Sequence, residues 1–553
     1  MLLSAIFSLY GILETCRKIG LPSSLYDALG QAWSIMRDSP VVFVSGQEVS
    51  PHWTVAAGGL LAKVFPYAAF VSGAWILFRD RLKEVWWRVF PNSHSIYIGL
   101  GERGSTLALS EMERKKGRRV VAIDIDEDNP AAELLRENGG LFLSGSGADP
   151  VMLRRAGVGN ACKVVILTKS DDLNVKVAEA VFAEWDRSQS KRNKRGSPVE
   201  VIVSVESHEY RQLLGDRWKV LQEMMLRGGS QRNQPAVRLA GFRSAAIRNV
   251  LLKIGKTQGV REEVRAKGLK VLVAGGNAFV EEFLKLAAAF LQLSGSSRAS
   301  RPEFVVCTNG NDLGGEFLRR YPLVDLIAQV RFIEEEPKDV AWAPTLEGLT
   351  FDVAVVSLPT EAATLSVSER LVRTSRLQVG HVYAMVPSIA DVQLNLNSQM
   401  ERISISNEGC DSLEFADVEL ELGARKHHQS YLESERTGGR SVPEWETLPE
   451  FIKESNRWVF LHGKIKEEIR NALKGSSSAV LDKLERHLAE CEHQRWMGER
   501  IMDGWVFGAA KDPEKRTHPS LKPFDALSSE EQEKDFVQVR VSDKTNTKND
   551  NHP

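Results

Sequence analysis

Cysteine is scarce in this sequence, and neither sign of charge is in excess. The five cysteines among 553 residues form no C-x-x-C pair, so the sequence indicates neither a disulfide framework nor a zinc site. With 72 Lys and Arg residues against 73 Asp and Glu residues, the formal net charge is −1, and we expect no nucleic-acid partner. His427, His493 and His518 match no zinc spacing, so we expect hydrogen-bonded histidines and no metal site.

Long hydrophobic runs are confined to the N-terminus. Residues 2–13 form a short apolar run, and residues 55–78 carry Lys63 as their only charge. The second run is long enough to span a bilayer, which takes about 20 residues, and the basic residues after it indicate a cytoplasmic edge. We therefore expect a transmembrane hairpin in lipid of the inner (cytoplasmic) membrane, with the chain after about residue 90 in the cytoplasm. A buried core hairpin is the alternative, because an intramembrane Lys63 is costly.

The segment between the two runs has the order of elements of a two-span potassium-channel pore. Residues 24–36 place apolar side chains at helical spacing, and residues 40–46 (PVVFVSG) have the character of an extended segment. The T-V-G-Y-G filter, whose carbonyl rings coordinate potassium, is absent from the sequence. The pattern therefore predicts a channel-like segment without predicting potassium selectivity.

A glycine-rich loop follows the first strand pattern after the membrane segment. Residues 95–98 have a strand pattern, residues 99–104 have G-x-G-x-x-G spacing, and the next strand pattern, 119–123, ends at Asp124. Glycines at this spacing allow a tight turn and a close approach of the backbone to a pyrophosphate, while the acid accepts hydrogen bonds from ribose hydroxyls. The sequence therefore predicts a nucleotide-binding site.

The alternation of strands and helices continues beyond this motif. Strand patterns at residues 141–144, 163–168 and 199–205 are separated by helical stretches, which predicts a parallel, doubly wound sheet. No His, Cys or Lys stands in a recognisable catalytic arrangement after these strands. We therefore expect no catalytic residues, and a sensor in preference to a dehydrogenase.

Residues 95 to about 253 resemble a known family. The segments GLGERGSTLALSEMERKKGRRVVAIDIDEDN and LFLSGSGADPVMLRRAGVGNACKVVILTKSDDLNV are similar to the nucleotide-binding half of the regulator-of-potassium-conductance domain, also called the Trk-type NAD-binding (TrkA-N-like) domain. The resemblance implies NAD or NADH as the ligand, with ATP or ADP as the alternative. It implies that Gly99, Gly101 and Gly104 face the phosphates and Asp124 the ribose. The other residues implied at the site are Arg103, Ser146 and Thr168.

A second copy of the alternation begins at residues 269–274. Here Gly275 and Gly276 are not followed by a glycine at the last position of the G-x-G-x-x-G motif. Cys307 and Thr308 stand at the end of the next strand, where the first copy has an acidic residue. We therefore expect a degenerate second domain that pairs with the first and binds no dinucleotide.

The segment from Leu488 to Phe536, LAECEHQRWMGERIMDGWVFGAAKDPEKRTHPSLKPFDALSSEEQEKDF, resembles the repeat (RyR) domain of ryanodine-receptor calcium-release channels. A shorter copy precedes it. Two tryptophans flanked by basic residues could sandwich a planar anionic ligand such as a nucleotide, and core tryptophans are the alternative interpretation. The candidate residues for this second ligand are Trp496, Arg500, Trp505, Lys511 and His518.

Together these patterns predict an α/β chain with an N-terminal transmembrane hairpin, two tandem Rossmann-like doubly wound parallel-sheet domains and a mainly α RyR-type domain. The predicted boundaries are 1–90 for the membrane segment, 91–267 and 268–415 for the two Rossmann-like domains, 416–541 for the RyR-type domain and 542–553 for a disordered tail.

The functional prediction is a membrane-anchored, nucleotide-regulated, ion-channel-like protein that assembles as a homo-oligomer, a dimer or a tetramer. A nucleotide-signal-activated membrane effector of a bacterial defence system is an alternative. An NAD-dependent oxidoreductase is the remaining one, and it would require a catalytic acid or base that the sequence does not show.

Overall fold

The computed structural model divides the chain into two compact units, Met1–Asn92 and Ser93–Pro553. It describes residues 94–114, 119–190, 199–207, 236–295, 297–308, 312–388, 396–411, 417–437 and 450–546, together with shorter segments and single positions elsewhere.

The described part of the N-terminal unit contains one pair of strands. Strand β1 (Val42–Val44) pairs antiparallel with β2 (Gln47–Val49), so the stretch predicted to be extended does contain a strand. The predicted apolar runs and the amphipathic segment 24–36 lie almost entirely outside the described residues. Among the residues that are described, no helix has the length and apolar character that a membrane span needs. The transmembrane hairpin therefore stays a prediction.

The first sheet is a six-stranded parallel sheet with the order β5-β4-β3-β6-β7-β8. Its strand interiors are continuous buried runs, as expected where helices cover both faces. The strands are β3 (His94–Ile98), β4 (Arg119–Asp124), β5 (Leu141–Ser144), β6 (Lys163–Ile166), β7 (Glu200–Ser204) and β8 (Ala236–Ala240). The helices between them are α4 (Glu102–Arg114), α5 (Pro130–Glu137), α6 (Pro150–Ala156) and α7 (Asp171–Ser190).

The second sheet repeats this topology, with the order β11-β10-β9-β12-β13-β14 and parallel pairing throughout. The predicted pair of Rossmann-like sheets is thus confirmed. The strands are β9 (Lys270–Gly275), β10 (Glu303–Thr308), β11 (Gln329–Glu334), β12 (Thr350–Ser357), β13 (Gln378–Val386) and β14 (Met400–Ser404). The helices are α11 (Asn277–Phe290), α12 (Leu313–Arg320) and α13 (Glu361–Arg373).

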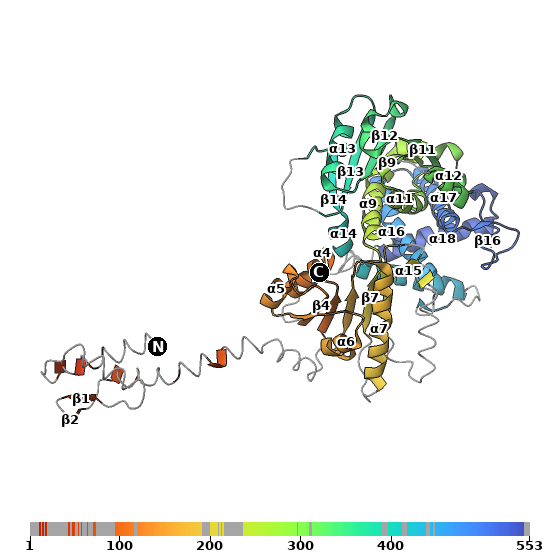
Figure 1. Cartoon of the computed structure of the whole chain (residues 1–553). Helices are drawn as coiled ribbons and strands as arrows, with labels where there is room; N and C mark the ends of the chain where they lie inside the picture. Colours follow the sequence, from red (N-terminus) through yellow and green to blue (C-terminus); the bar gives the residue numbers. More distant parts are fainter. Residues whose placement is uncertain are drawn as a thin grey trace. The chain divides into compact units, whose positions relative to one another are not determined.

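Helix α9 (Phe242–Gly259) crosses from the first sheet to the second domain. It follows β8 directly and packs against α11, α14 (Ile405–Asp411) and α16 (Glu450–Ala472), and its label in Figure 1 lies among theirs, to the right of the centre of the view. The short helix α10 (Glu262–Lys267) then leads into β9. The crossover helix therefore touches elements of every part of the Ser93–Pro553 unit.

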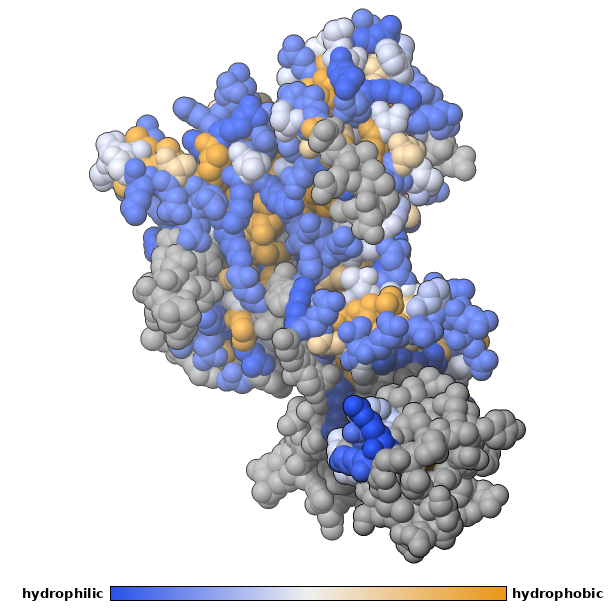
Figure 2. Space-filling model, turned by 90° about the vertical axis from the view of Figure 1, so that its left-hand side faces the viewer, coloured by the Kyte–Doolittle hydropathy of each residue, from blue (hydrophilic) through white to orange (hydrophobic). Residues whose placement is uncertain are grey.

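The C-terminal part is mainly helical. It consists of α15 (Asp417–Thr437), α16 (Glu450–Ala472), α17 (Ser478–Met502) and α18 (Ser529–Asn546), with short parallel strands β15 (Val506–Phe507) and β16 (Thr517–His518). Helix α18 continues to Asn546. Residues 542–546, which were predicted as the start of a disordered tail, are therefore helical. One hydrophobic core runs through α9, the second domain and these helices. The face shown in Figure 2 is mostly hydrophilic among its described residues, with small hydrophobic areas.

Candidate functional site

The carboxyl ends of β3 and β6 lie side by side where the strand order of the first sheet reverses. Ligands of doubly wound sheets bind at this switch point. In the loop after β3, Gly99 has φ 93°, and a Cβ there would lie 2.5 Å from the Leu167 carbonyl oxygen. A Cβ on Gly104, in the first turn of α4, would overlap the Gly99 carbonyl oxygen. Both positions therefore require glycine, the first for the turn and the second for close packing of helix on strand.

Gly101 differs from the other two glycines of the loop. No atom of the described residues lies within 4 Å of the position that its Cβ would take. The backbone at Gly101 is therefore open to an incoming group, as a phosphate-binding turn requires. Helix α4 starts at Glu102, so the positive end of its dipole is directed at the same space.

Asp124 holds the glycine loop from the end of β4. One carboxylate oxygen accepts a hydrogen bond from the backbone N–H of Leu100, and the other accepts one from the backbone N–H of Asp126 at 3.0 Å. The side-chain amide of Asn129 donates to the Leu100 carbonyl at 3.0 Å. A carboxylate has about four lone-pair sites, so Asp124 retains the capacity to accept from ribose hydroxyls.

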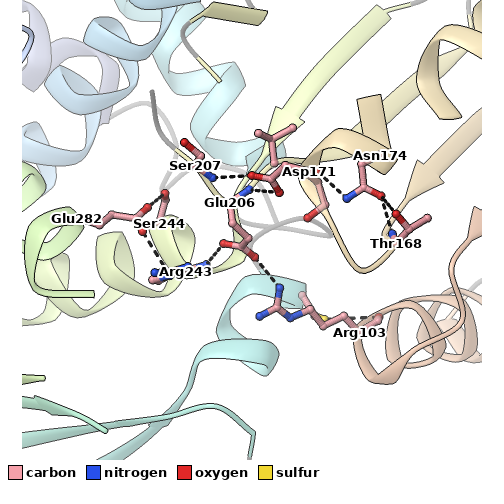
Figure 3. Close-up of polar contacts among 12 residues, drawn as sticks. Arg103, Thr168, Asp171, Asn174, Glu206, Ser207, Arg243, Ser244 and Glu282 are labelled. Carbon is pink, nitrogen blue, oxygen red and sulfur yellow. Dashed lines mark hydrogen bonds and ion pairs between the residues drawn. The ribbon is translucent and has the colours of Figure 1, made fainter. Parts of the chain in front are cut away.

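Arg103 joins the glycine-loop helix to the crossover helix. Its Nη1 donates to Oε1 of Glu206 at 2.6 Å, and its guanidinium lies 4.5 Å from the ring centroid of Phe242. The second carboxylate oxygen of Glu206 accepts from the backbone N–H of Arg243 at 3.2 Å, as Figure 3 shows. The structure thus directs the charge of Arg103 toward Glu206, not toward the space in front of the glycine loop.

Asp171 and Asn174, which were not among the predicted site residues, join the ends of β6 and β7 beside Thr168, which was predicted. The backbone N–H and hydroxyl of Thr168 donate to Oδ1 of Asn174 at 2.6 and 2.7 Å. Asp171 accepts from the backbone N–H groups of Glu206 and Ser207 at 2.9 and 3.0 Å, a contact visible in Figure 3. Asp171 and Asn174 lie in the first turn of α7, and position at the start of the helix that follows a parallel strand is the signal that would have identified them.

Ser146 lies in the loop after β5. Its hydroxyl accepts from the backbone N–H of Ala148 at 3.3 Å. A Cβ on the neighbouring Gly147 would overlap the side chain of Ile98, the last residue of β3. The structure therefore brings the Ser146 loop up to the end of β3, beside the glycine loop.

The corresponding edge of the second sheet has different chemistry. Gly276, the N-cap of α11, has φ −72°, which any residue can adopt. At the tip of β10 the thiol of Cys307 donates to the Glu335 carbonyl at 3.2 Å. Burial, followed by the nearby charges of Glu335 and Glu336, raises the pKa of Cys307 to about 12. Thr308, whose side chain is uncharged, ends β10 as Asp124 ends β4, and that this half binds no dinucleotide remains a prediction.

The residues predicted for a second ligand gather around His518. The His518 ring lies 4.9 Å from that of Trp496 and 6.4 Å from that of Trp505, between ring centroids, and Arg500 lies 5.5 Å from the Trp505 ring. Burial, with the charges of Lys511 and Arg500, lowers the pKa of His518 to about 4. The imidazole of His518 thus contacts both indoles edge to face. The two tryptophans predicted to sandwich a ligand are therefore packed against a histidine.

Helices α16 and α17 share a buried ion cluster. Lys466 donates to Glu492, and Glu492 also pairs with Arg495 at 2.9 Å. All three side chains are buried. Burial alone would raise the pKa of Glu492, but the charges of Arg495 and Lys466 hold it well below its ordinary value. Arg495 continues to Glu499 at 2.9 Å, so the cluster reaches the side of α17 that faces α9 and α11.

The other two histidines considered as metal ligands, His427 and His493, are hydrogen-bonded to the C-terminal segment of the chain. His427 pairs with the side chain of Gln538 at 2.5 Å. His493 bonds the Lys522 carbonyl at 2.8 Å and lies 3.2 Å from a carboxylate oxygen of Asp535. These contacts connect α15 and α17 to the C-terminal segment, so both imidazoles act in packing.

Two family models match parts of the chain. Residues 96–218 match the TrkA-N domain, and residues 476–549 match the RyR domain. The chain therefore contains a TrkA-N domain and a RyR domain, and the resemblances noted in the sequence are confirmed.

Three solved structures show a remote likeness. GsuK bound to ADP is 14% identical with a TM-score of 0.31, and the match covers 74% of this chain and 94% of that chain. The GsuK channel bound to NAD is 12% identical with a TM-score of 0.33, covering 74% and 80%. The NAD(P)-binding domain of an exopolyphosphatase-related protein from Archaeoglobus fulgidus is 20% identical with a TM-score of 0.21, covering 30% and 99%. No curated protein matches the chain.

Proposed function

We propose that the TrkA-N domain binds NAD or NADH, with ATP or ADP as the alternative ligand, and that the protein is a nucleotide-regulated, channel-like membrane protein. One observation carries the proposal: Gly99 and Gly104 are fixed by backbone contacts while Gly101 is open. This division of roles matches the three requirements of a pyrophosphate-binding turn. Asp124 supplies the ribose acceptor at the tip of the adjacent strand.

The proposed role is regulatory and not catalytic. The polar groups after β6 and β7 are engaged in binding backbone: Asp171 holds two N–H groups and Asn174 holds Thr168 and the Ser204 carbonyl. Glu206 links the glycine-loop helix to α9. Side chains used in this way connect the nucleotide site to the crossover helix, which is the arrangement that a sensor needs.

The membrane part of the proposal rests on the sequence. The apolar run 55–78 and the basic residues after it support a span in the inner membrane with the TrkA-N domain in the cytoplasm. A channel path also requires several copies, because two short spans from one subunit cannot shield water from lipid. We therefore include homo-oligomer formation in the proposal.

Thermal unfolding of the full-length protein in detergent tests nucleotide binding. A ligand present at 100 times its dissociation constant stabilises the folded state by about 2.7 kcal/mol. We expect stabilisation by NAD, NADH, ATP or ADP at millimolar concentration. No stabilisation by any of the four would contradict the proposal.

A further inference from the structure

A cavity of about 330 Å³ lies where the crossover helix meets the RyR-type helices. Its walls come from β8 and α9 on one side, from α11 on another, and from α15, α16, α17 and the loop after α17. The volume is in the range of small-molecule sites. None of the glycine-loop residues lines it, so the cavity is separate from the nucleotide site proposed above.

Cationic side chains predominate in the lining. Among the described residues that line the cavity, seven carry a cationic side chain and four carry a carboxylate. The seven come from separate elements, and they are Arg211, Arg238, Arg248, Lys285, Arg457, Arg495 and Arg516. Convergence of guanidinium groups from several elements is the arrangement that binds phosphate groups, because each guanidinium can donate two parallel hydrogen bonds.

Three of the four carboxylates in the lining, Glu421, Glu454 and Glu499, are paired with arginines. Glu454 lies 3.6 Å from Arg248 and 3.0 Å from Arg457, and Glu499 lies 2.9 Å from Arg495. These pairs hold the arginines in place around the cavity. Arg516 donates to a neutral acceptor, the Asp503 carbonyl, at 2.6 Å, and that bond does not cancel its charge.

The remaining wall is aromatic and apolar. Phe290 of α11 and Trp458 of α16 pack with their ring centroids 5.0 Å apart, and both are buried. Trp505, which is half-buried, lines the cavity beside Arg516, and Met502 lies on the same wall. A planar ring can stack on an indole while its charged substituents meet the arginines.

A series of contacts connects the cavity with the glycine loop. The Arg243 side chain lies 3.4 Å from Glu282, and the hydroxyl of Ser244 donates to the same carboxylate. Arg211, which lines the cavity, donates to Ser244. Since Glu206 bonds both Arg103 and the backbone of Arg243, the two sites share the first turn of α9 (Figure 3).

We propose that this cavity binds a nucleotide, with the phosphates on the arginines and the base against Trp505, as a second ligand site distinct from the glycine loop. The ligand would touch the crossover helix, the second domain and the RyR domain together. Its binding would therefore act on the packing of α9 against α11 and α16.

The test uses the full-length protein in detergent, carrying both Gly101→Val and Asp124→Ala, which should abolish nucleotide binding at the glycine loop. Equilibrium dialysis with ADP and with GTP measures binding, and we expect saturable binding of at least one of the two at one molecule per chain. Arg516→Gln and Trp505→Leu, added singly, should each weaken it at least about tenfold, which equals 1.4 kcal/mol. Lys515→Gln is the matched control, because Lys515 is 80% exposed and does not line the cavity.

Three results would overturn the proposal. These are no binding of ADP or GTP, equal effects of Arg516→Gln, Trp505→Leu and Lys515→Gln, or binding of inorganic tripolyphosphate as tight as that of the nucleotide. The last result would mean that the site recognises phosphate without a base. Failure of the glycine-loop proposal would appear separately, because NAD, NADH, ATP and ADP would then stabilise the unchanged protein no more than they stabilise the variant with Gly101→Val and Asp124→Ala.

Discussion

The backbone of Gly498 in α17 lies against the backbone of Ala289 in α11. A Cβ on Gly498 would come within 2.7 Å of the Ala289 Cα and within 3.2 Å of the Ala288 carbonyl oxygen. Neither atom belongs to a side chain that could turn away. The RyR domain therefore packs on the second Rossmann-like domain at a distance that only glycine permits.

Gly498→Ala is expected to destabilise the protein by about 1–3 kcal/mol, the usual cost of overpacking. Helix propensity alone predicts the opposite sign, since alanine is favoured over glycine by about 1 kcal/mol in a helix interior. Chemical denaturation measures the change. Gly259→Ala in α9 is the control, because its nearest atoms are side-chain carbons, with Cδ1 of Ile469 at 3.2 Å. A destabilisation of the same size in both variants would contradict the packing argument.

Gly101→Val and Gly276→Val form a matched pair, because no atom of the described residues lies within 4 Å of either added Cβ. Gly101→Val should abolish stabilisation by NAD, since it fills the space proposed for the pyrophosphate, and Gly276→Val should preserve it. Asp124→Ala should also abolish it, because the ribose acceptor and the loop anchor are both lost. Thermal unfolding with and without NAD is the measurement. Loss of stabilisation in Gly276→Val alone would assign the working site to the second domain.

Arg103→Gln should weaken NAD binding by less than about tenfold, or 1.4 kcal/mol. The reason is that its guanidinium is bound to Glu206 at 2.6 Å and stacked on Phe242, away from the open space at Gly101. Titration calorimetry on the full-length protein measures the change. A loss of a hundredfold or more would show that Arg103 leaves Glu206 for the ligand.

Buried histidines predict a loss of stability below neutral pH. Burial lowers the pKa of His427 and of His462 to about 4, against about 6.5 in an unfolded chain. Between these values the unfolded chain binds a proton at each histidine and the folded chain does not, so stability falls as the pH drops from about 6.5 toward 4. Each histidine contributes up to about 1.4 kcal/mol per pH unit.

Chemical denaturation at pH 7, 6 and 5 measures this slope. His427→Gln should reduce it by the equivalent of one proton, and His462→Gln should do the same. An unchanged slope in both variants would mean that other groups cause the pH dependence.

Residues 1–90 should direct a fused reporter to the membrane fraction with its C-terminus in the cytoplasm, because the run 55–78 is long enough to span and basic residues follow it. Alkaline carbonate should leave the reporter in the membrane, and extraction would contradict the span. Reconstituted protein should show little preference for potassium over sodium, since the sequence has no T-V-G-Y-G filter. Strong potassium selectivity would mean that residues 40–46 form a filter of another kind.

The strands at the centre of each sheet could be predicted from sequence, because burial on both faces produces continuous runs of β-branched residues. Residues 95–98 were predicted as a strand and lie in β3 (His94–Ile98), which has a neighbouring strand on each side. The edge strands β8 and β14 were missed. β14 (MERIS) carries charged residues, so its pattern is weak, whereas the edge strand β5 (LFLS) is apolar and was predicted with the same bounds.

The glycine-loop site was predictable because its residues follow a local spacing that backbone geometry dictates. The cavity was not, because its lining comes from elements separated by up to several hundred residues and forms only when the RyR domain docks. Of the five residues predicted for a second ligand, Trp505 lines the cavity, while Trp496, Arg500, Lys511 and His518 do not.

Selection should retain the glycines of the two loops to different extents as this protein evolves. Gly99 has a left-handed backbone and Gly104 has no room for a Cβ. A substitution at either position would therefore impair folding and be removed by selection. Gly276 has an ordinary backbone and open space, and selection on folding would not retain it. Among descendants of the same ancestor, position 276 should therefore vary freely while positions 99 and 104 stay glycine. Position 101 should stay glycine only in those lineages that kept the ligand.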